Sequence, residues 1–381
     1  MKLQTRLIHA GDVHPRFAGA VTLPIFQSST FEYGGEKKYE DVRYIRLNNT
    51  PNHAALGKVL AAIEGAEAAI VTGSGMAAIS STLLALLKAG DHLLAQQGLY
   101  GGSHTFITDH LPDLGVSFDF IDAARPESWP AGLKPNTKAV LVETISNPLL
   151  QVLDHRRMVD FARAHGLVSI IDNTLASPIN FRPPALGYDL SVHSCTKYLN
   201  GHSDIVAGAV IGKAELVERV NLKAVHLGGC LDPHACFLLE RGIKTLALRV
   251  RQHNENGQRM AEFLEGHPKA VRVIYPGLAS HPDHAIARAL LDGFGGLLSF
   301  ELKGGAASAQ RLIEHLRIPV HAPSLGGVES LITLPARTSH AGLDPQERRR
   351  LGISDGLIRL AIGIEDAEDL IEDMAQALGA A

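Results

Sequence analysis

The sequence predicts an α/β fold, with a mostly parallel sheet of about seven strands followed by a smaller C-terminal α+β domain. From about residue 55, short runs rich in Val and Ile alternate with amphipathic stretches, which is typical of βαβ units. The short runs are apolar almost throughout, as expected for strands covered by helices on both faces. Beyond Gly242 this alternation ends, and a long amphipathic stretch indicates a second domain.

Seven apolar runs fit the strands of the larger sheet. Helices are expected between several of them, notably over Met76–Lys88 and His155–His165, which are amphipathic. In chain order, the strands are expected at Ala69–Val71, His92–Ala95, Ser117–Ile121, Ala139–Glu143, Val168–Ile171, Leu190–His193 and Ile205–Ile211.

The remaining segments lie on either side of this sheet. Thr245–Leu264 contains no Pro and predicts a long helix, and strands are expected at Val271–Tyr275 and Gly296–Leu302, followed by further helices. Residues 1–50 show no clear period, and such a long irregular segment is expected to pack on something else. We therefore predict an N-terminal arm over 1–48, an α/β domain over 49–243 and an α+β domain over 244–381.

Composition excludes several classes of protein. The 381 residues include 36 Lys plus Arg and 40 Asp plus Glu, which gives a formal net charge of −4 and no basic field for nucleic acid. No apolar stretch reaches the roughly 20 residues that span a membrane. The cysteines, Cys195, Cys230 and Cys236, are too few for a disulfide framework, and the N terminus lacks the apolar region of a signal peptide. We therefore expect a cytoplasmic protein.

The most informative residues follow the strands, because ligands of open α/β sheets bind at the carboxyl ends of the strands. After the first strand, the segment from Thr72 to Ala78 is rich in small residues and opens a helix, so main-chain N–H groups can bind a phosphate. Gly73-x-Gly75-x-x-Ala78 also fits a dinucleotide site, but no acidic residue closes the second strand as that site requires. A NAD-binding oxidoreductase and a plain glycine turn remain as alternatives.

Two other strand ends carry side chains suited to a planar ligand. Tyr100 lies among glycines after the second strand, where its ring can cover such a ligand or serve as a turn residue. Asn147 follows the fourth strand, where its amide can reach a ligand hydroxyl or simply form an Asn-Pro turn.

The fifth and sixth strand ends carry the charged groups. Asp172 ends a hydrophobic strand, where a carboxylate needs either a helix to cap or a cation such as a protonated pyridine nitrogen. Ser194 and Thr196 have hydroxyls that can bind one phosphate, and the adjacent Lys197 can form a Schiff base, although a surface turn is the alternative. Together, these five strand ends describe a site for pyridoxal 5′-phosphate.

The motifs at these strand ends resemble those of the Cys/Met-metabolism, or trans-sulfuration, family of fold-type-I pyridoxal-phosphate enzymes. That family includes cystathionine γ-synthase, cystathionine γ- and β-lyases, methionine γ-lyase and O-acylhomoserine sulfhydrylases. The resemblance covers nearly the whole chain. Its most specific motifs are His193–Asp204 with Ala207-Gly208, Ser324–Leu331, and Ile358–Leu360 with Gly363–Asp366.

The resemblance implies a role for each site residue. Lys197 would hold the cofactor and move protons, Asp172 would pair with the ring nitrogen, and Tyr100 would stack on the ring and assist acid–base steps. The remaining contacts would be Gly75, Met76, Ser194 and Thr196 at the phosphate, Asn147 near the ring hydroxyl, and Arg359 with Ser324 at the substrate α-carboxylate.

The resemblance also implies an oligomer. Tyr44 and Arg46 match residues that reach the phosphate of a neighbouring subunit, which would explain why the arm over 1–48 shows no packing pattern of its own. The expected assembly is a homotetramer built as a dimer of dimers.

The implied activity is elimination or replacement at the γ-carbon of sulfur amino acids or O-acylhomoserine. Arg43 and Pro323 stand where relatives often carry acidic residues near the distal part of the substrate, so a distal anion should be tolerated. Gly102 stands where methionine γ-lyases usually carry Cys. Cystathionine β-lyase, methionine γ-lyase and O-acylhomoserine sulfhydrylase remain alternatives. No metal is expected, because His281 and His284 lack further ligands nearby.

Overall fold

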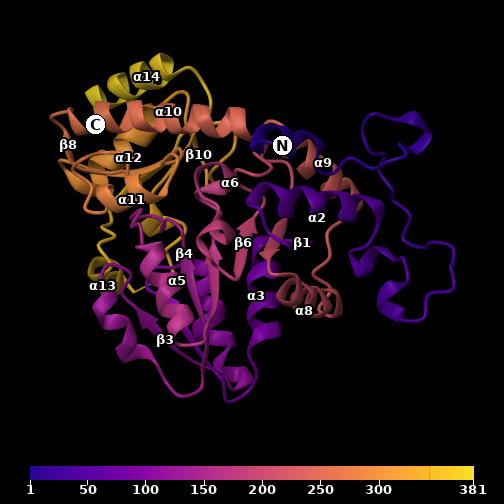
Figure 1. Ribbon diagram of the computed structural model, residues 1–381. Helices are drawn as coiled ribbons and strands as arrows, with labels where there is room; N and C mark the ends of the chain where they lie inside the picture. Colours follow the sequence, from indigo (N-terminus) through magenta and orange to yellow (C-terminus); the bar gives the residue numbers. More distant parts are fainter. Residues whose placement is uncertain (343) are drawn as a thin grey trace.

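The computed structural model describes residues 1–342 and 344–381, and its larger sheet has seven strands in the order β1-β7-β6-β5-β4-β2-β3 (Figure 1). Strands β2 to β6 pair in parallel, whereas β7 lies antiparallel between β1 and β6. The strands are β1 Ala68–Thr72, β2 His92–Gln96, β3 Ser117–Ile121, β4 Thr137–Glu143, β5 Val168–Asp172, β6 Leu190–Ser194 and β7 Gly208–Gly212.

The predicted α/β class and the mostly parallel sheet are confirmed, and each strand overlaps the apolar run that predicted it. The last strand begins at Gly208 rather than Ile205, because Ala207 bonds through its N–H to the Thr196 hydroxyl in the preceding loop. The segment 195–207 is short and carries no crossover helix, so the chain can return only antiparallel to β6. This return places Lys197 in the loop at the carboxyl end of β6.

Helices cover both faces of the larger sheet, which explains why β2 and β7 are buried at every position. Helices α2 (Pro51–Glu64) and α9 (Pro233–Ile243) pack on one face, with α3 (Gly75–Leu86) and α8 (Ala214–His226) on the other. Local sequence fixes the helix ends. Pro51 occupies the first turn of α2, and the following Gly65 has a φ of 73°, which favours glycine.

The second sheet has the strand order β10-β11-β12-β9-β8 within the described residues, and α10, α12 and α14 pack on it around a separate core. The predicted helix over 245–264 and the strands at 271–275 and 296–302 are confirmed within a residue or two. The elements are α10 Leu246–Glu265, β8 Ala270–Ile274, β9 Leu297–Leu302, α12 Gly305–His315, β10 Val320–His321, β11 Leu331–Thr333, β12 Ile358–Ala361 and α14 Ala367–Ala380.

The sequence missed β10, β11 and β12, because runs of two to four residues show no measurable period. It also missed the short N-terminal helix α1. The remaining helices are α1 Leu3–His9, α4 Gly101–Thr105, α5 His155–Ala164, α6 Ser177–Asn180, α7 Pro183–Leu186, α11 His284–Leu290 and α13 Pro345–Arg350.

Between α1 and α2 the chain forms an irregular arm that projects away from the two sheets (Figure 1). Its large apolar side chains include Val21, 80% exposed, and Tyr33, 66% exposed. The domain boundaries at 48/49 and 243/244 stay a prediction. Within residues 1–342 and 344–381, no helix has the length and apolar character needed to span a membrane.

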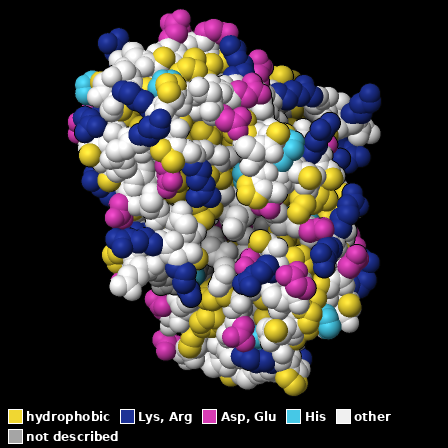
Figure 2. Space-filling model, turned by 90° about the vertical axis from the view of Figure 1, so that its left-hand side faces the viewer, with side chains coloured by type: hydrophobic (Ala, Val, Ile, Leu, Met, Phe, Trp, Pro, Cys, Tyr) yellow, Lys and Arg dark blue, Asp and Glu magenta, His cyan; other side chains and the backbone are white. Residues whose placement is uncertain are grey.

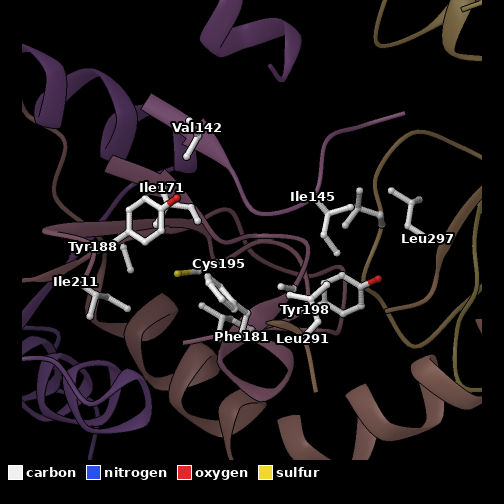
Figure 3. Close-up of a cluster of buried hydrophobic side chains, with 14 of the residues drawn as sticks. Val142, Ile145, Ile171, Phe181, Tyr188, Cys195, Tyr198, Ile211, Leu291 and Leu297 are labelled. Atoms are coloured by element: carbon white, nitrogen blue, oxygen red, sulfur yellow. The ribbon is translucent and has the colours of Figure 1, made fainter. Parts of the chain in front are cut away.

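The largest buried apolar cluster extends from the larger sheet to the smaller one (Figure 3). It contains Ile171 of β5 and Leu297 of β9, so the two sheets share this core. Cys195 and Tyr198, which lie on either side of Lys197 in the chain, are 0% and 2% exposed within it. Buried side chains therefore flank Lys197 on both sides in the chain.

Candidate active site

The carboxyl ends of the central strands meet at one edge of the larger sheet. Thr72 and Ser194 both pair with Gly208, so the ends of β1 and β6 lie at the same level. A cavity of about 710 Å³ opens at this edge. Its lining includes the predicted site residues Gly75, Met76, Tyr100, Asn147, Asp172, Ser194, Thr196, Lys197, Ser324 and Arg359.

One end of the cavity offers donors for an anion. Ser74 caps α3 by accepting a hydrogen bond from Ala77 N at 3.0 Å, which leaves the N–H groups of Gly75 and Met76 outside the helical ladder. A Cβ atom at Gly75 would lie 2.8 Å from Ser194 Cβ, so only glycine lets the helix start approach the Ser194 strand end. Helix N–H groups and two hydroxyls, those of Ser194 and Thr196, therefore border the same space.

Lys197 lines the cavity, half-buried, and its Nζ donates to Ser324 Oγ at 2.9 Å. Burial lowers the pKa of the Lys197 ammonium below its usual range, and the positive charge of Arg359 lowers it further. Ser324 itself has a φ of 106°, a conformation that non-glycine residues rarely adopt. The residue that holds the lysine is therefore one of the strained backbone positions of the chain.

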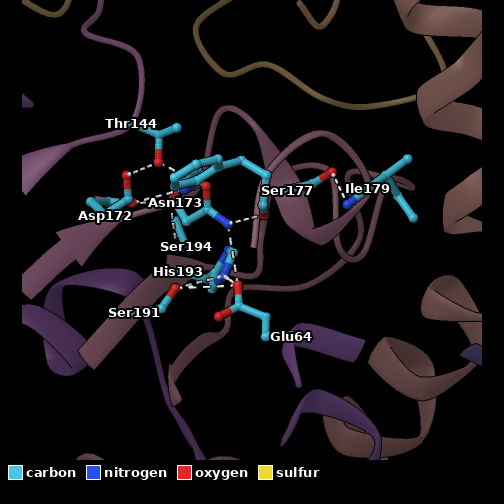
Figure 4. Close-up of polar contacts among 11 residues, drawn as sticks. Glu64, Thr144, Asp172, Asn173, Ser177, Ile179, Ser191, His193 and Ser194 are labelled. Atoms are coloured by element: carbon cyan, nitrogen blue, oxygen red, sulfur yellow. Dashed lines mark hydrogen bonds and ion pairs between the residues drawn. The ribbon is translucent and has the colours of Figure 1, made fainter. Parts of the chain in front are cut away.

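Asp172 lies at the end of β5 (Figure 4), and the turn that follows it donates hydrogen bonds to its carboxylate. Thr174 donates to Asp172 Oδ1 through both its N–H, at 3.0 Å, and its hydroxyl, and the Thr174 hydroxyl accepts from Ser194 N at 2.8 Å. Burial raises the pKa of Asp172, whereas these hydrogen bonds and the charge of His193 lower it. A carboxylate half-buried in a cavity in this way is stabilised by a cation placed opposite it.

Arg359 lies on β12 and points into the cavity from the smaller sheet. It is 5% exposed, and burial lowers its pKa to about 10. Its Nη2 donates to Ser324 O at 2.9 Å and its Nη1 lies 3.5 Å from Asn147 Oδ1, while its buried Nε has no partner in the described part of the chain. A buried guanidinium with an unused donor fits a bound carboxylate.

Tyr100 precedes α4 and remains 48% exposed at the cavity. Its main-chain N–H donates to Glu143 Oε1 at 2.6 Å. Sequence reasoning overlooked Glu143, which ends β4, and Thr174, which fixes Asp172. Both had a detectable signal, because each is a polar residue at or just beyond a predicted strand end.

The arm residues lie elsewhere. Within the described chain, Tyr44, Arg46 and Arg43 are not part of the cavity lining. Arg46 donates to Val225 O at 3.1 Å and to the Tyr39 hydroxyl at 2.8 Å. Arg43 is exposed, with its guanidinium 5.7 Å from the centre of the Phe31 ring. A single chain therefore does not bring these three residues to the site.

The cavity fits pyridoxal 5′-phosphate. The phosphate would meet the N–H groups of Gly75 and Met76 and the nearby hydroxyls, and the ring nitrogen would meet Asp172. The aldehyde would meet Lys197, whose amine is made more reactive by its lowered pKa. The space that glycine leaves at residue 75 and the unused Nε of Arg359 provide room and a donor for the cofactor and an amino-acid carboxylate.

The described residues do not favour a metal centre or a basic surface for nucleic acid. Among the described residues, no group of three or more His, Cys, Asp or Glu side chains is arranged to hold a metal ion. Charged side chains of both signs are interspersed over the face shown in Figure 2, rather than gathered into one basic field.

Comparison with known proteins agrees with this geometry. Residues 4–379 match the family described as Cys/Met metabolism PLP-dependent enzymes. The chain is 41% identical over 379 residues to a cystathionine γ-lyase of Bacillus subtilis, covering 99% of both chains. It is 42% identical over 377 residues to a cystathionine β-lyase of Lactococcus lactis, covering 99% of this chain and 98% of the relative.

A solved structure has the same fold. A cystathionine γ-lyase from Lactobacillus plantarum, in complex with L-serine, superposes with a TM-score of 0.94 at 37% identity, covering 100% of this chain and 99% of the other. Nearly the whole chain is thus matched in both sequence and fold, and the chain belongs to the family of Cys/Met-metabolism enzymes that depend on pyridoxal 5′-phosphate.

Proposed function

We propose that the chain cleaves the γ-carbon–sulfur bond of cystathionine, forming cysteine, 2-oxobutanoate and ammonia with uptake of one water. The observation that carries this proposal is the arrangement of one cavity, in which Lys197 is hydrogen-bonded to Ser324, shares the lining with Asp172 and lies within electrostatic reach of Arg359. The similarity to a Bacillus subtilis cystathionine γ-lyase supports the choice of substrate. The same residues would serve γ-replacement on an O-acylhomoserine.

Each residue has a separate task. When bound, the cofactor supplies a ring that withdraws the electron pair left behind when a proton leaves the substrate Cα. Asp172 keeps the ring nitrogen protonated, and Arg359 holds the substrate α-carboxylate through its guanidinium fork. Lys197 Nζ, whose pKa is lowered by burial, takes the Cα proton while its hydrogen bond to Ser324 directs it. After passing that proton on, it takes a proton from Cβ, and the electron pair left there allows the Cγ–S bond to break.

Tyr100 is the proposed acid that protonates the leaving group. Its side chain is exposed to the cavity, where the hydroxyl can deliver a proton to the departing sulfur. Gly75, Met76, Ser194 and Thr196 bind the phosphate and Asn147 lies near the ring hydroxyl, so that these groups orient the cofactor before the substrate arrives.

We further propose that the arm completes the site of a second copy. Tyr44 and Arg46 would bind the phosphate there and Arg43 would face the distal part of the substrate. The support is that these residues lie outside the cavity of their own chain and that the arm exposes large apolar side chains such as Tyr33 and Tyr39. A homotetramer, built as a dimer of dimers, is the proposed assembly. Free cysteines at 195, 230 and 236 support a reducing, cytoplasmic setting.

Cleavage at the β-carbon is the second candidate, because the Lactococcus lactis relative is a cystathionine β-lyase at similar identity. Methionine γ-lyase activity is disfavoured by the residue at position 102. A Cβ atom at Gly102 would lie 2.8 Å from a Tyr100 ring carbon and 2.9 Å from Met76 Sδ, so the cysteine expected there does not fit without displacing Tyr100 or Met76.

The test is to incubate the purified holoenzyme with cystathionine and identify the keto acid by mass. We expect 2-oxobutanoate as the main product. Pyruvate as the main product would mean that the enzyme cleaves at the β-carbon rather than the γ-carbon. The proposed cofactor site would not be affected by that result. If neither forms, cysteine and an O-acylhomoserine are added, and formation of cystathionine would identify a synthase.

A further inference from the structure

Glu143 is a carboxyl group at the cavity that the proposed mechanism does not use. It is the last residue of β4, is 6% exposed, and lines the same cavity as Lys197. Its Oε1 accepts a hydrogen bond of 2.6 Å from the main-chain N–H of Tyr100. Glu143 therefore lines the cavity and contacts a proposed site residue directly.

Glu143 is also the partner of Asp172 across the parallel strands β4 and β5. Neighbouring strands lie about 4.8 Å apart, and paired residues project from the same face of a sheet. Two carboxylates on paired residues in a site of low dielectric constant each raise the energy of the other's charge. This arrangement favours a state in which one of the two carboxyls keeps a proton.

The hydrogen bonds indicate which carboxyl keeps it. Burial raises the pKa of Asp172, but two hydrogen bonds from Thr174 and the electrostatic influence of His193 oppose this shift and favour the ionised form. Figure 4 shows His193 on the strand next to that of Asp172. Glu143 has the Tyr100 N–H as its single donor in the described chain. In agreement, burial and the neighbouring Asp172 raise the pKa of Glu143 well above its usual range. The proton belongs on Glu143.

Tyr100 depends on this contact for its position. Its side chain is 48% exposed, and it precedes α4, a helix of five residues, so burial does not hold its ring. The hydrogen bond to Glu143 ties its main chain to the end of β4, next to the strand that carries Asp172.

We propose that Glu143 is a positioning residue that stays neutral, so that Asp172 is the single anion beside the cofactor ring, and that it fixes Tyr100 through the Tyr100 main-chain N–H. This inference rests on the proposed function, because Tyr100 and Asp172 have their tasks only in that reaction. Glu143 itself acts through these two residues.

The first experiment tests the charge. Glu143→Gln keeps an oxygen acceptor for the Tyr100 N–H and is always neutral, whereas Asp172→Asn removes the proposed anion. The absorption band of the bound cofactor and its dissociation constant are measured in the full-length holoenzyme. We expect Glu143→Gln to keep the band position and a dissociation constant within about 3-fold of the parent, and Asp172→Asn to change both. A Glu143→Gln protein whose band shifts as in Asp172→Asn would overturn the neutral assignment.

The second experiment tests the route through Tyr100. Glu143→Ala should lower kcat/KM for cystathionine about 10- to 100-fold, because a buried N–H loses its acceptor. In a Tyr100→Ala background the same change should cost less than about 3-fold, since no ring remains to be positioned. Two effects that simply multiply would refute the positioning role. Val142→Ala, buried on the same strand outside the cavity lining, is the matched control for lost stability.

Failure of this inference is distinguishable from failure of the proposed function. A parent enzyme that forms no keto acid from cystathionine contradicts the function, whatever Glu143 does. A parent enzyme that is active, but whose Glu143→Gln variant shifts the cofactor band, contradicts only the role of Glu143. If Glu143→Ala does not fold, the comparison of Glu143→Gln with Asp172→Asn still decides the charge.

Discussion

Replacing Arg359 by Gln removes the group proposed to bind the substrate α-carboxylate. In the free protein Arg359 donates to Ser324 O at 2.9 Å and lies 3.5 Å from Asn147 Oδ1, and its Nε has no partner among the described residues. The side chain is thus held at one end and leaves donors available at the other. A Gln side chain is shorter and neutral, so it offers neither the charge nor the fork.

The expected size of the effect comes from these contacts. A hydrogen bond to a charged group contributes about 1.5–3 kcal/mol, and a guanidinium fork makes two of them to a carboxylate. The loss is partly offset, because removing a buried charge also removes its desolvation cost. At about 1.36 kcal/mol per tenfold change, a net loss of about 3–4 kcal/mol lowers kcat/KM roughly 100- to 1000-fold.

The assay is steady-state release of keto acid from cystathionine, with cofactor occupancy followed by absorbance. Arg359→Lys is the matched control, because it keeps the charge without the fork and should give an intermediate rate. Cofactor occupancy should change little in both variants. If Arg359→Gln retained kcat/KM within about 5-fold, or if activity fell only in proportion to lost cofactor, Arg359 would not be the group that binds the carboxylate.

Three further predictions concern stability and packing. His155 is fully buried, donating from Nε2 to Thr144 O and accepting from the Tyr188 hydroxyl, and burial lowers its pKa to about 4. The unfolded chain therefore binds the proton more readily, so acidification from pH 6.5 toward 4 should lower the free energy of unfolding, by about 2 kcal/mol at pH 5 for this residue. Urea titrations of the parent and His155→Gln at several pH values check this. Equal dependence of the free energy of unfolding on pH in the two proteins would contradict it. Gly75→Ala should weaken binding of pyridoxal 5′-phosphate at least about 10-fold, because its Cβ would meet Ser194 at 2.8 Å; Gly379→Ala, with open space around its Cβ, is the control. Gly102→Cys should lower kcat/KM for cystathionine about 10-fold by displacing the Tyr100 ring, and an unchanged value would mean that the ring has room to move.

Much of the larger sheet and its site followed from one regularity. Strands that are buried on both faces have continuous apolar runs in their sequences. The carboxyl ends of parallel strands must meet at one edge of the sheet. Gly75, Asp172 and Lys197 are far apart in the chain, yet this rule places them together, and they line one cavity. Their chemical roles stay predictions until the variants are measured.

The rest depended on information that no local pattern carries. β12, which brings Arg359 to the cavity, has four residues and no readable period, so from the sequence alone only the family resemblance indicated Arg359. The φ of 106° at Ser324 is imposed by the surrounding fold rather than by the residue type. Glu143 was predicted as part of a strand, and its closeness to Asp172 depends on the register between β4 and β5, which the sequence does not define.

We expect Lys197 to be the residue that binds the cofactor covalently. Treating the holoenzyme with borohydride fixes pyridoxal 5′-phosphate to the amine that holds it, and peptide mass mapping then identifies that residue. We expect a single modified peptide containing Lys197, and no such label in Lys197→Ala, which should also form no keto acid from cystathionine. A label on another lysine, or full turnover by Lys197→Ala, would contradict it.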